Sequence, residues 1–217
     1  MWIKNTIIVL CVFVTAILSG CASFPQNEVA KVTQMPDVSR YQNKPAIYID
    51  FKFYQGLPDS GTAIEMPSFK THFLPDLEKS VQNLGLFKSV TFDEFKKAGT
   101  DYTIKMLCYN HGNGGAAAIS GFVTGFTFGV IPGAATDNYT LKVQLIDSNG
   151  TVVKEIVNKD SVTTWIGLWF IPVMGNTPKE AVLTTLENQI KTALKSIIET
   201  GKLKYSINSY DYLRVNG

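Results

Sequence analysis

The sequence contains little of what metal and catalytic sites are usually built from. Three of its 217 residues are cysteines and two are histidines. No HxxxH, CxxC or HExxH spacing occurs, although a metal site needs several nitrogen, sulfur or carboxylate ligands that converge. A Gly-x-Ser-x-Gly nucleophile elbow and a phosphate-binding loop are also missing. We therefore expect no metal, no cofactor, no catalytic residue and a protein that is not an enzyme.

The remaining reactive side chains have ordinary structural interpretations. Cys108 is a conceivable nucleophile because His111 follows three residues later, but closeness in sequence at a strand end is a poor guide to a catalytic dyad. A buried thiol in the core is the commoner role of such a cysteine. We interpret His72 and His111 as surface residues.

The chain also lacks an excess of charge of either sign. Its net charge is +2, and it falls to +1 if Lys4 is removed with an amino-terminal signal. Nucleic-acid-binding domains usually carry a marked basic patch. We therefore expect no nucleic-acid partner.

The amino terminus has the pattern of a secretory signal. Lys4 precedes an apolar run of twelve residues, Ile7 to Leu18, and the small residues Ser19 and Gly20 follow. Such a run is too short to span a hydrocarbon core of about 30 Å. We predict a signal peptide over residues 1–20. The alternative is an ordinary membrane anchor followed by a chance cysteine.

The tetrad Leu18-Ser19-Gly20-Cys21 resembles the lipobox of bacterial lipoproteins. The resemblance implies cleavage before Cys21, a diacylglycerol on its sulfur and an acyl group on its new amine. Ala22 in the next position implies the outer membrane, with the protein on the periplasmic side, if the source is Gram-negative. Cys108 would then be the one free cysteine, so no intramolecular disulfide could form.

A polar segment separates Cys21 from the folded region. Residues 22–45 contain Pro25, Pro36 and Pro45 and show no apolar period. We predict that residues 21–45 are the acylated cysteine and a flexible tether.

Residues 46–201 have the periodicities of an α+β domain. Apolar residues alternate with polar ones in five segments, which predicts half-buried strands at 46–54, 86–92, 101–109, 139–146 and 151–164. A stripe from Phe69 to Leu84, interrupted by Pro75, predicts one helix. A capping box at Thr177–Glu180 begins a second helix that ends at Gly201. We expect a mainly antiparallel sheet of about five strands with two helices on one face. Residues 202–217 form a tail.

Two apolar inserts interrupt this pattern. Residues 115–133 are nineteen residues without a charge, and residues 165–174 are a second apolar tract. We expect both to lie at one end of the domain and to face a membrane or another subunit. The residues expected to make this contact are Gly121, Phe122, Gly125, Phe126, Gly129, Trp165 and Trp169.

The conformation of the inserts stays open between three alternatives. The spacing of four between Gly121, Gly125 and Gly129 favours a helix whose small-residue face packs closely on another helix, with Gly125 at its centre. An alternation of period two is compatible with a β-hairpin that faces lipid. The inserts could also fold back into the core.

The element order resembles that of the TolB amino-terminal and CsgG-like envelope lipoproteins, as does the string Leu84-Gly85-Leu86-Phe87-Lys88-Ser89-Val90. This resemblance implies protein binding or envelope assembly. Our leading hypothesis is an accessory or assembly lipoprotein, anchored by its lipid, whose inserts contact a membrane or an envelope protein partner. The alternative is self-association into a pore- or channel-forming oligomer, in which insert hairpins from several copies close a barrel.

Overall fold

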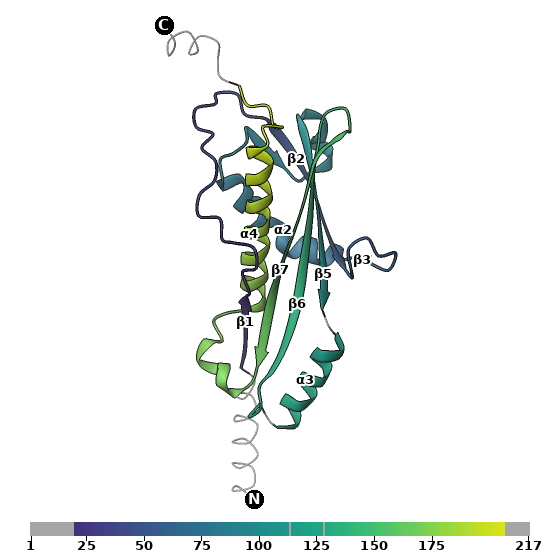
Figure 1. The fold of residues 1–217 in the computed structure, drawn as a ribbon, viewed down its shortest axis with the longest axis vertical. Coiled ribbons are helices and arrows are strands. Elements are labelled where there is room, and N and C mark those ends of the chain that lie inside the picture. The colour runs from purple at the N-terminus through teal and green to yellow at the C-terminus, as the bar shows by residue number, and fades with distance from the viewer. Residues whose placement is uncertain (1–19, 113, 128, 207–217) are drawn as a thin grey trace, which may run out of the picture. The chain divides into compact units, whose positions relative to one another are not determined.

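The structure is a computed structural model that describes residues 20–112, 114–127 and 129–206 (Figure 1). The predicted signal peptide lies outside these residues except for Gly20. The elements, in order, are β1 (Cys21–Pro25), β2 (Ala46–Gln55), β3 (Ile64–Glu65), α2 (Pro67–Asn83), β4 (Ser89–Thr91), η1 (Glu94–Gly99), β5 (Tyr102–Gly112), α3 (Gly114–Phe126), β6 (Gly133–Ile146), β7 (Val152–Ile166), η2 (Leu168–Val173) and α4 (Pro178–Glu199).

The strands form one mixed, mainly antiparallel sheet, which confirms the predicted α+β class. Their order is β1-β7-β6-β5-β2-β3, and β4 pairs with β2 outside this path. Strand β2 runs parallel to β4 and β5, whereas β1 and β3 pair antiparallel with β7 and β2. The sheet has seven strands rather than about five, because the short strands β1 and β3 add to its edges.

Two compact units divide the chain, where the sequence suggested a single domain. Unit 1 comprises Met1–Gln26, His111–Asn138 and Ser161–Thr185. Unit 2 comprises Asn27–Asn110, Tyr139–Asp160 and Leu186–Gly217. The division follows the apolar inserts, since both of them belong to unit 1.

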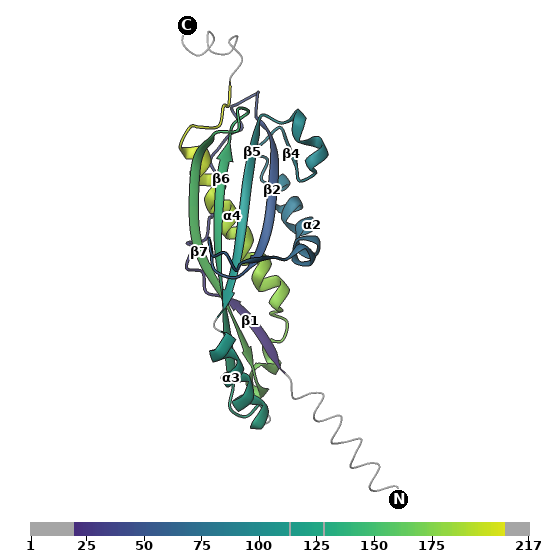
Figure 2. The same cartoon turned by 90° about the vertical axis from the view of Figure 1, so that its right-hand side faces the viewer.

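Unit 2 has the core that the periodicities predict. Ile47, Ile49, Phe51 and Phe53 of β2 are buried, as are Ile104 and Met106 of β5 and Leu141, Val143 and Leu145 of β6. Helix α2 buries Phe73, Leu77 and Val81 and continues through Pro75 as one element. Figure 2 shows α4 behind strands β5 and β6 and α2 beside β2. Alternation in strands and a 3.6-residue stripe in helices thus produce the expected layers.

The start of α4 shows one of the two bonds of the predicted capping box, because the Thr177 backbone N–H donates to the Gly175 carbonyl at 3.1 Å rather than to the Glu180 side chain. The Thr177 hydroxyl accepts a hydrogen bond from the Glu180 backbone N–H at 3.3 Å and donates one to the Glu180 carboxylate at 3.1 Å. Pro178 occupies the first helical position, where its missing N–H removes no intrahelical bond. Leu186, Ile190, Ala193 and Ile197 then point into the core of unit 2.

The segment predicted to be a flexible tether has defined partners. Residues 21–25 form β1, and further on the buried Asn188 amide holds the backbone on both sides of Lys31. Its Nδ2 donates to the Val29 carbonyl at 2.9 Å, and its Oδ1 accepts from the Val32 N–H at 3.0 Å. This segment resembled a tether because side chains far away in the sequence, rather than its own apolar residues, hold it in place.

The beginning of the predicted tail is also packed. Leu203 is buried, and the Tyr205 hydroxyl donates to the Leu86 carbonyl at 3.1 Å. Burial raises the pKa of Tyr205 to about 12. Residues 207–217 lie outside the described residues.

Candidate functional site

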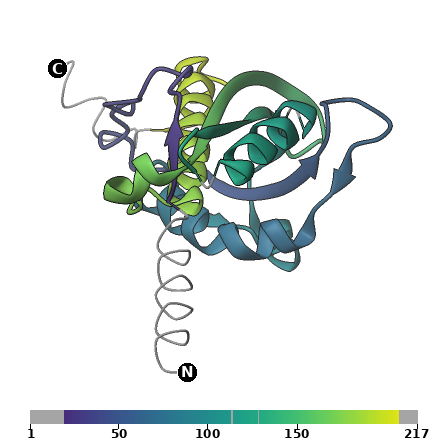
Figure 3. The same cartoon turned by 90° about the horizontal axis from the view of Figure 1, so that it is seen from below.

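Unit 1 brings the predicted lipid-attachment residue together with both apolar inserts. Strand β1 pairs antiparallel with the end of β7, so that Cys21 lies opposite Ile166 and Pro25 opposite Val162. Strand β1 also contacts η2, beside which it lies in Figure 3. The Ser23 N–H donates to the Asn176 carbonyl at 2.9 Å, which covers part of the free edge of β1. Cys21 itself is half-buried.

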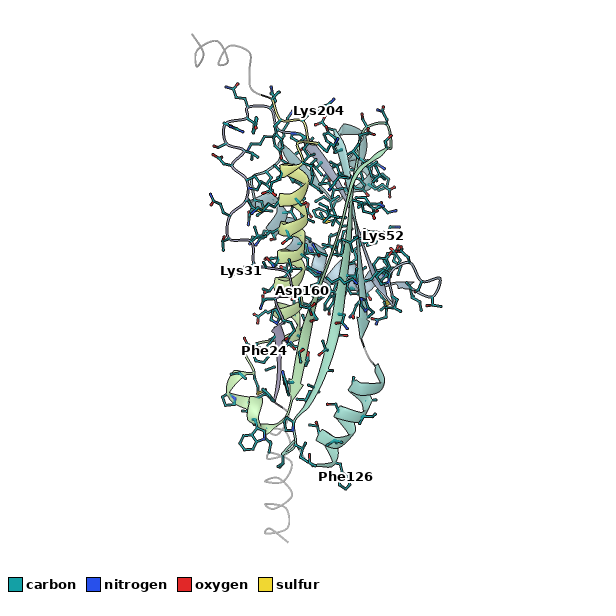
Figure 4. All side chains as sticks on the ribbon, viewed as in Figure 1. Phe24, Lys31, Lys52, Phe126, Asp160 and Lys204 are labelled. Atoms are coloured by element: carbon teal, nitrogen blue, oxygen red, sulfur yellow. The ribbon has the colours of Figure 1, made fainter. Side chains whose placement is uncertain are left out.

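The first insert contains a helix, α3, that is polar toward the protein and apolar toward solvent. Thr124 is 5% exposed and Ser120 is half-buried, and these two residues lie four apart on one helical face. The exposed fractions of Ile119 and Phe126 are 70% and 78%, and Val123 is also exposed. The Phe126 side chain points outward from α3 (Figure 4). This is the reverse of an ordinary surface helix, whose apolar stripe faces the core.

The Ser120 hydroxyl holds the inner face of α3 against the start of β6, whereas the Thr124 hydroxyl donates to the Ser120 carbonyl of its own helix. The Ser120 Oγ accepts a hydrogen bond from the Ala134 N–H at 2.6 Å. A Cβ atom added to Gly133 would collide with the Thr124 Oγ1 and would lie 2.8 Å from the Ser120 Oγ. Only glycine allows this close approach. Because the side of α3 that carries these hydroxyls faces the protein, its apolar side faces solvent.

The two inserts are joined by the turn after α3. Gly129 has a φ of +80°, and its carbonyl accepts a hydrogen bond from the Leu168 N–H at 3.1 Å. The next carbonyl, that of Val130, accepts one from the Trp169 indole N–H at 3.0 Å. These bonds place the second insert against the end of the first.

The glycine face predicted on the first insert does not pack against the second. A Cβ atom added to Gly121 or Gly125 would meet no atom within 4 Å apart from the helix's own backbone and chain neighbours. Of the three glycines spaced by four, only Gly129 lies close to the second insert. The packed positions of α3 are instead Ser120 and Thr124, one residue earlier in the same spacing.

The second insert presents further apolar surface. Trp165 is half-buried, and the centroid of its ring lies 5.5 Å from the centroid of the Phe170 ring in a stacked arrangement. Trp169 is 69% exposed although its indole N–H is bonded. The other exposed apolar side chains of unit 1 are Val130, Ile131, Ile166, Val173 and Met174. Apolar surface on this scale indicates contact with another phase or molecule.

Charged side chains are scarce in this unit. In residues 20–26, 111–138 and 161–185 the acidic and basic residues are Asp137, Lys179 and Glu180. Burying ionised groups in an apolar phase is costly, so a surface that lacks them can leave water at low cost. Among the helices of the described residues, none combines the length and apolar character that a membrane span requires.

The predicted contact residues thus have different environments. Phe126 and Trp169 are exposed, Gly121 and Gly125 lie on open helix surface, Trp165 is half-buried and Gly129 is buried in the turn. Phe122 belongs to α3, but its side chain is outside the described part of the structure. Ser120, Thr124, Gly133 and Gly167 were not among the contact residues predicted from the sequence. The spacing of four between Ser120 and Thr124, inside an otherwise apolar tract, is a signal that could have found the first two.

The other candidate side chains show no assembled chemistry. Cys108 is fully buried, and burial raises the pKa of its thiol, which disfavours the reactive thiolate. His72 lies exposed on α2 with its ring against the edge of Phe73. Within the part of the chain that the structure describes, no group of three or more His, Cys, Asp or Glu side chains could hold a metal ion.

Comparison with known proteins gives structural likeness without sequence likeness. No protein-family model and no curated protein matches the sequence. Two structures of PelC dodecamers from Paraburkholderia phytofirmans are similar to this chain, one of them a variant with a Leu-to-Met substitution. The variant is 15% identical with a TM-score of 0.35, and the match covers 82% of this chain and 98% of that one. The second is 14% identical with a TM-score of 0.35, covering 82% and 97%. At these TM-scores neither likeness supports an argument about function.

Proposed function

We propose that this chain is a non-catalytic lipoprotein of the cell envelope, which holds unit 1 against the membrane leaflet that contains the acyl chains of Cys21. The resemblance of Leu18–Cys21 to a lipobox supports the anchor, and Ala22 supports the periplasmic face of the outer membrane. Its proposed role is that of an accessory or assembly factor, in which unit 2 contacts other components of the envelope.

One observation carries this proposal: the anchor residue and the exposed apolar side chains belong to the same compact unit. Acyl chains on Cys21 would insert into the bilayer next to η2, which β1 contacts. Each buried CH₂ of an acyl chain contributes about 0.8 kcal/mol of membrane affinity. Removing an exposed Ile or Phe side chain from water adds up to about 1.5–3 kcal/mol. Unit 1 would therefore add its own affinity to that of the lipid.

The test measures membrane binding without the anchor. A soluble form that begins at residue 21 and carries Cys21→Ala is floated with liposomes. Ile119→Asp replaces a 70% exposed side chain of α3 with a charge and should lower the partition constant for liposomes roughly tenfold. Ile64→Asp is the matched control, because Ile64 is 66% exposed but lies in β3 of unit 2. It should leave flotation unchanged.

Intrinsic fluorescence provides a second readout in the same experiment. Trp165 and Trp169 are the only tryptophans after Trp2 in the sequence, and both belong to the second insert. Their emission should shift to the blue when liposomes are added. If the soluble form neither floats nor changes its emission, unit 1 does not bind lipid and the proposal fails.

Other occupants of the apolar surface would give different results. If Ile119→Asp leaves flotation unchanged but breaks self-association, copies of the chain cover this surface, and a pore- or channel-forming oligomer becomes the better interpretation. Mass measurement of the detergent-extracted protein distinguishes a ring of many copies from a monomer. Binding to one envelope protein, lost in the same variant, would identify a protein partner instead.

A further inference from the structure

The ladder between β1 and β7 continues one step beyond the predicted cleavage site. The Gly167 N–H donates a hydrogen bond to the Gly20 carbonyl at 2.9 Å, next to the pair Cys21–Ile166. Gly20 is the last residue of the predicted signal peptide, so processing removes this acceptor. In the mature chain the Gly167 N–H has lost this acceptor and needs another partner, because a donor left without one is destabilising.

Processing of a lipoprotein supplies a chemically equivalent group. Water hydrolyses the Gly20–Cys21 peptide bond and frees the Cys21 amine. That amine then attacks an ester carbonyl of a phospholipid, which forms an amide and leaves a lysophospholipid. The new amide has the same nitrogen as the original peptide bond and a carbonyl in the same bonded position as that of Gly20.

We propose that the Gly167 N–H binds the carbonyl of the N-acyl group on Cys21, so that unit 1 recognises the N-acylated form of its own amino terminus. The inference depends on the acylation of Cys21 that the proposed function includes. In the form with a free amine, the β1–β7 ladder ends one hydrogen bond earlier and a charged ammonium stands beside an apolar segment.

The surroundings of Gly20 also select the kind of acyl chain. The first methylene of the chain would take the position of the Gly20 Cα. A Cβ atom at that position would lie 2.7 Å from the Gly167 carbonyl oxygen and 2.8 Å from the Ile171 backbone nitrogen. These backbone atoms leave no room for a branch in one of the two possible configurations at that carbon. The site therefore accepts a straight-chain fatty acyl group and excludes one that carries a branch of this configuration next to its carbonyl.

Gly167 is held in place by both apolar inserts. Its φ is +155°, and a Cβ atom added there would lie 3.1 Å from the Gly129 carbonyl oxygen and 3.3 Å from the Pro132 Cα. The adjacent Leu168 N–H is bonded to the Gly129 carbonyl. The donor is thus positioned before the acyl group arrives, which favours binding.

Hydrogen exchange on the full lipidated protein tests the inference. The protein is purified in detergent micelles from cells with and without their N-acylating enzyme, and mass spectrometry confirms the acyl groups on Cys21. The Gly167 amide should exchange about tenfold more slowly in the N-acylated form. The Leu168 amide is the internal control and should be equally protected in both forms, since its acceptor does not change.

Three outcomes would overturn the inference. Equal exchange of Gly167 in both forms would show that the N-acyl carbonyl is not its partner. Loss of protection at Leu168 as well as Gly167 in the free-amine form would report the opening of the whole segment instead of one hydrogen bond. If Cys21 carries no lipid in either preparation, the proposed function fails together with the inference. If Cys21 is lipidated and Gly167 is unaffected, only the inference fails.

Discussion

Glycines in unit 1 have opposite roles according to what surrounds each one. Gly133 lies under the two hydroxyls of α3, whereas Gly125 lies on open helix surface. A side chain is excluded at the first position, and at the second glycine only weakens the helix. The spacing of glycines along the chain does not distinguish these cases. The atoms within reach of each Cβ position do.

This difference predicts opposite effects of one substitution. Gly133→Ala should destabilise unit 1 by about 1–3 kcal/mol, because the new Cβ overfills the contact with Ser120 and Thr124. Gly125→Ala should stabilise it by about 0.8–1 kcal/mol, because alanine favours an exposed helix interior. Urea unfolding of the soluble Cys21→Ala form, followed by tryptophan fluorescence, reports on unit 1. Equal midpoints for the two variants would contradict the packing described for α3.

At the scale of elements, the segment after β1 is held by Asn188 of α4 and Asp160 of β7. Asn188 is buried, and its side-chain amide donates to the Val29 carbonyl and accepts from the Val32 N–H, as the backbone of a neighbouring strand would. The Asp160 carboxylate accepts a further hydrogen bond from the Glu28 N–H at 3.0 Å. Both Lys31 and Asp160 are labelled in Figure 4. Residues 28–32 are therefore ordered by polar contacts rather than by apolar burial.

Asn188→Ala should release this segment. The hydrogen bonds to the backbone of Val29, Ala30 and Val32 are lost, and these backbone groups bond to water instead, at a cost of about 1–3 kcal/mol. Trypsin should then cleave after Lys31 faster than in the unchanged protein, as followed by mass spectrometry of the fragments. Glu187→Ala is the control, because Glu187 pairs with Lys191 along the helix rather than with residues 28–32. Equal cleavage rates in the three proteins would show that Asn188 does not hold the segment.

At the scale of the whole molecule, the proposed function makes Cys21 the origin of membrane attachment. An acyl anchor with more than one chain holds a protein on a bilayer firmly, whereas the side chains of unit 1 give reversible binding. The two contributions therefore differ in strength and are separable by mutation.

Cys21→Ala in cells should abolish labelling by palmitate and remove most of the protein from the outer-membrane fraction. A residual bound fraction should disappear when Ile119→Asp is added, because the remaining attachment comes from the apolar side chains of unit 1. Protein that still takes up palmitate and sediments with outer membranes after Cys21→Ala would show that the anchor lies elsewhere.

The local periodicities of the sequence were sufficient to predict the core of unit 2. The alternation in β2 and the stripe of α4 depend on neighbours two to four residues apart, and the capping box depends on Thr177 and Glu180 three apart. Such patterns can be read directly because they follow from backbone geometry. The predicted α+β class followed from them.

What the tertiary structure decided depends on residues far apart in the chain. Cys21 lies opposite Ile166, Val32 bonds to Asn188, and Gly133 contacts a helix that ended before it. Because of these contacts, residues 21–25 of the predicted tether form strand β1, and the apolar side of α3 faces solvent. No local period in the sequence predicts these contacts, because the two residues of each contact are far apart in the chain and meet only in the folded protein. By itself the sequence determined which segments are apolar, and the fold determined which side of each is exposed.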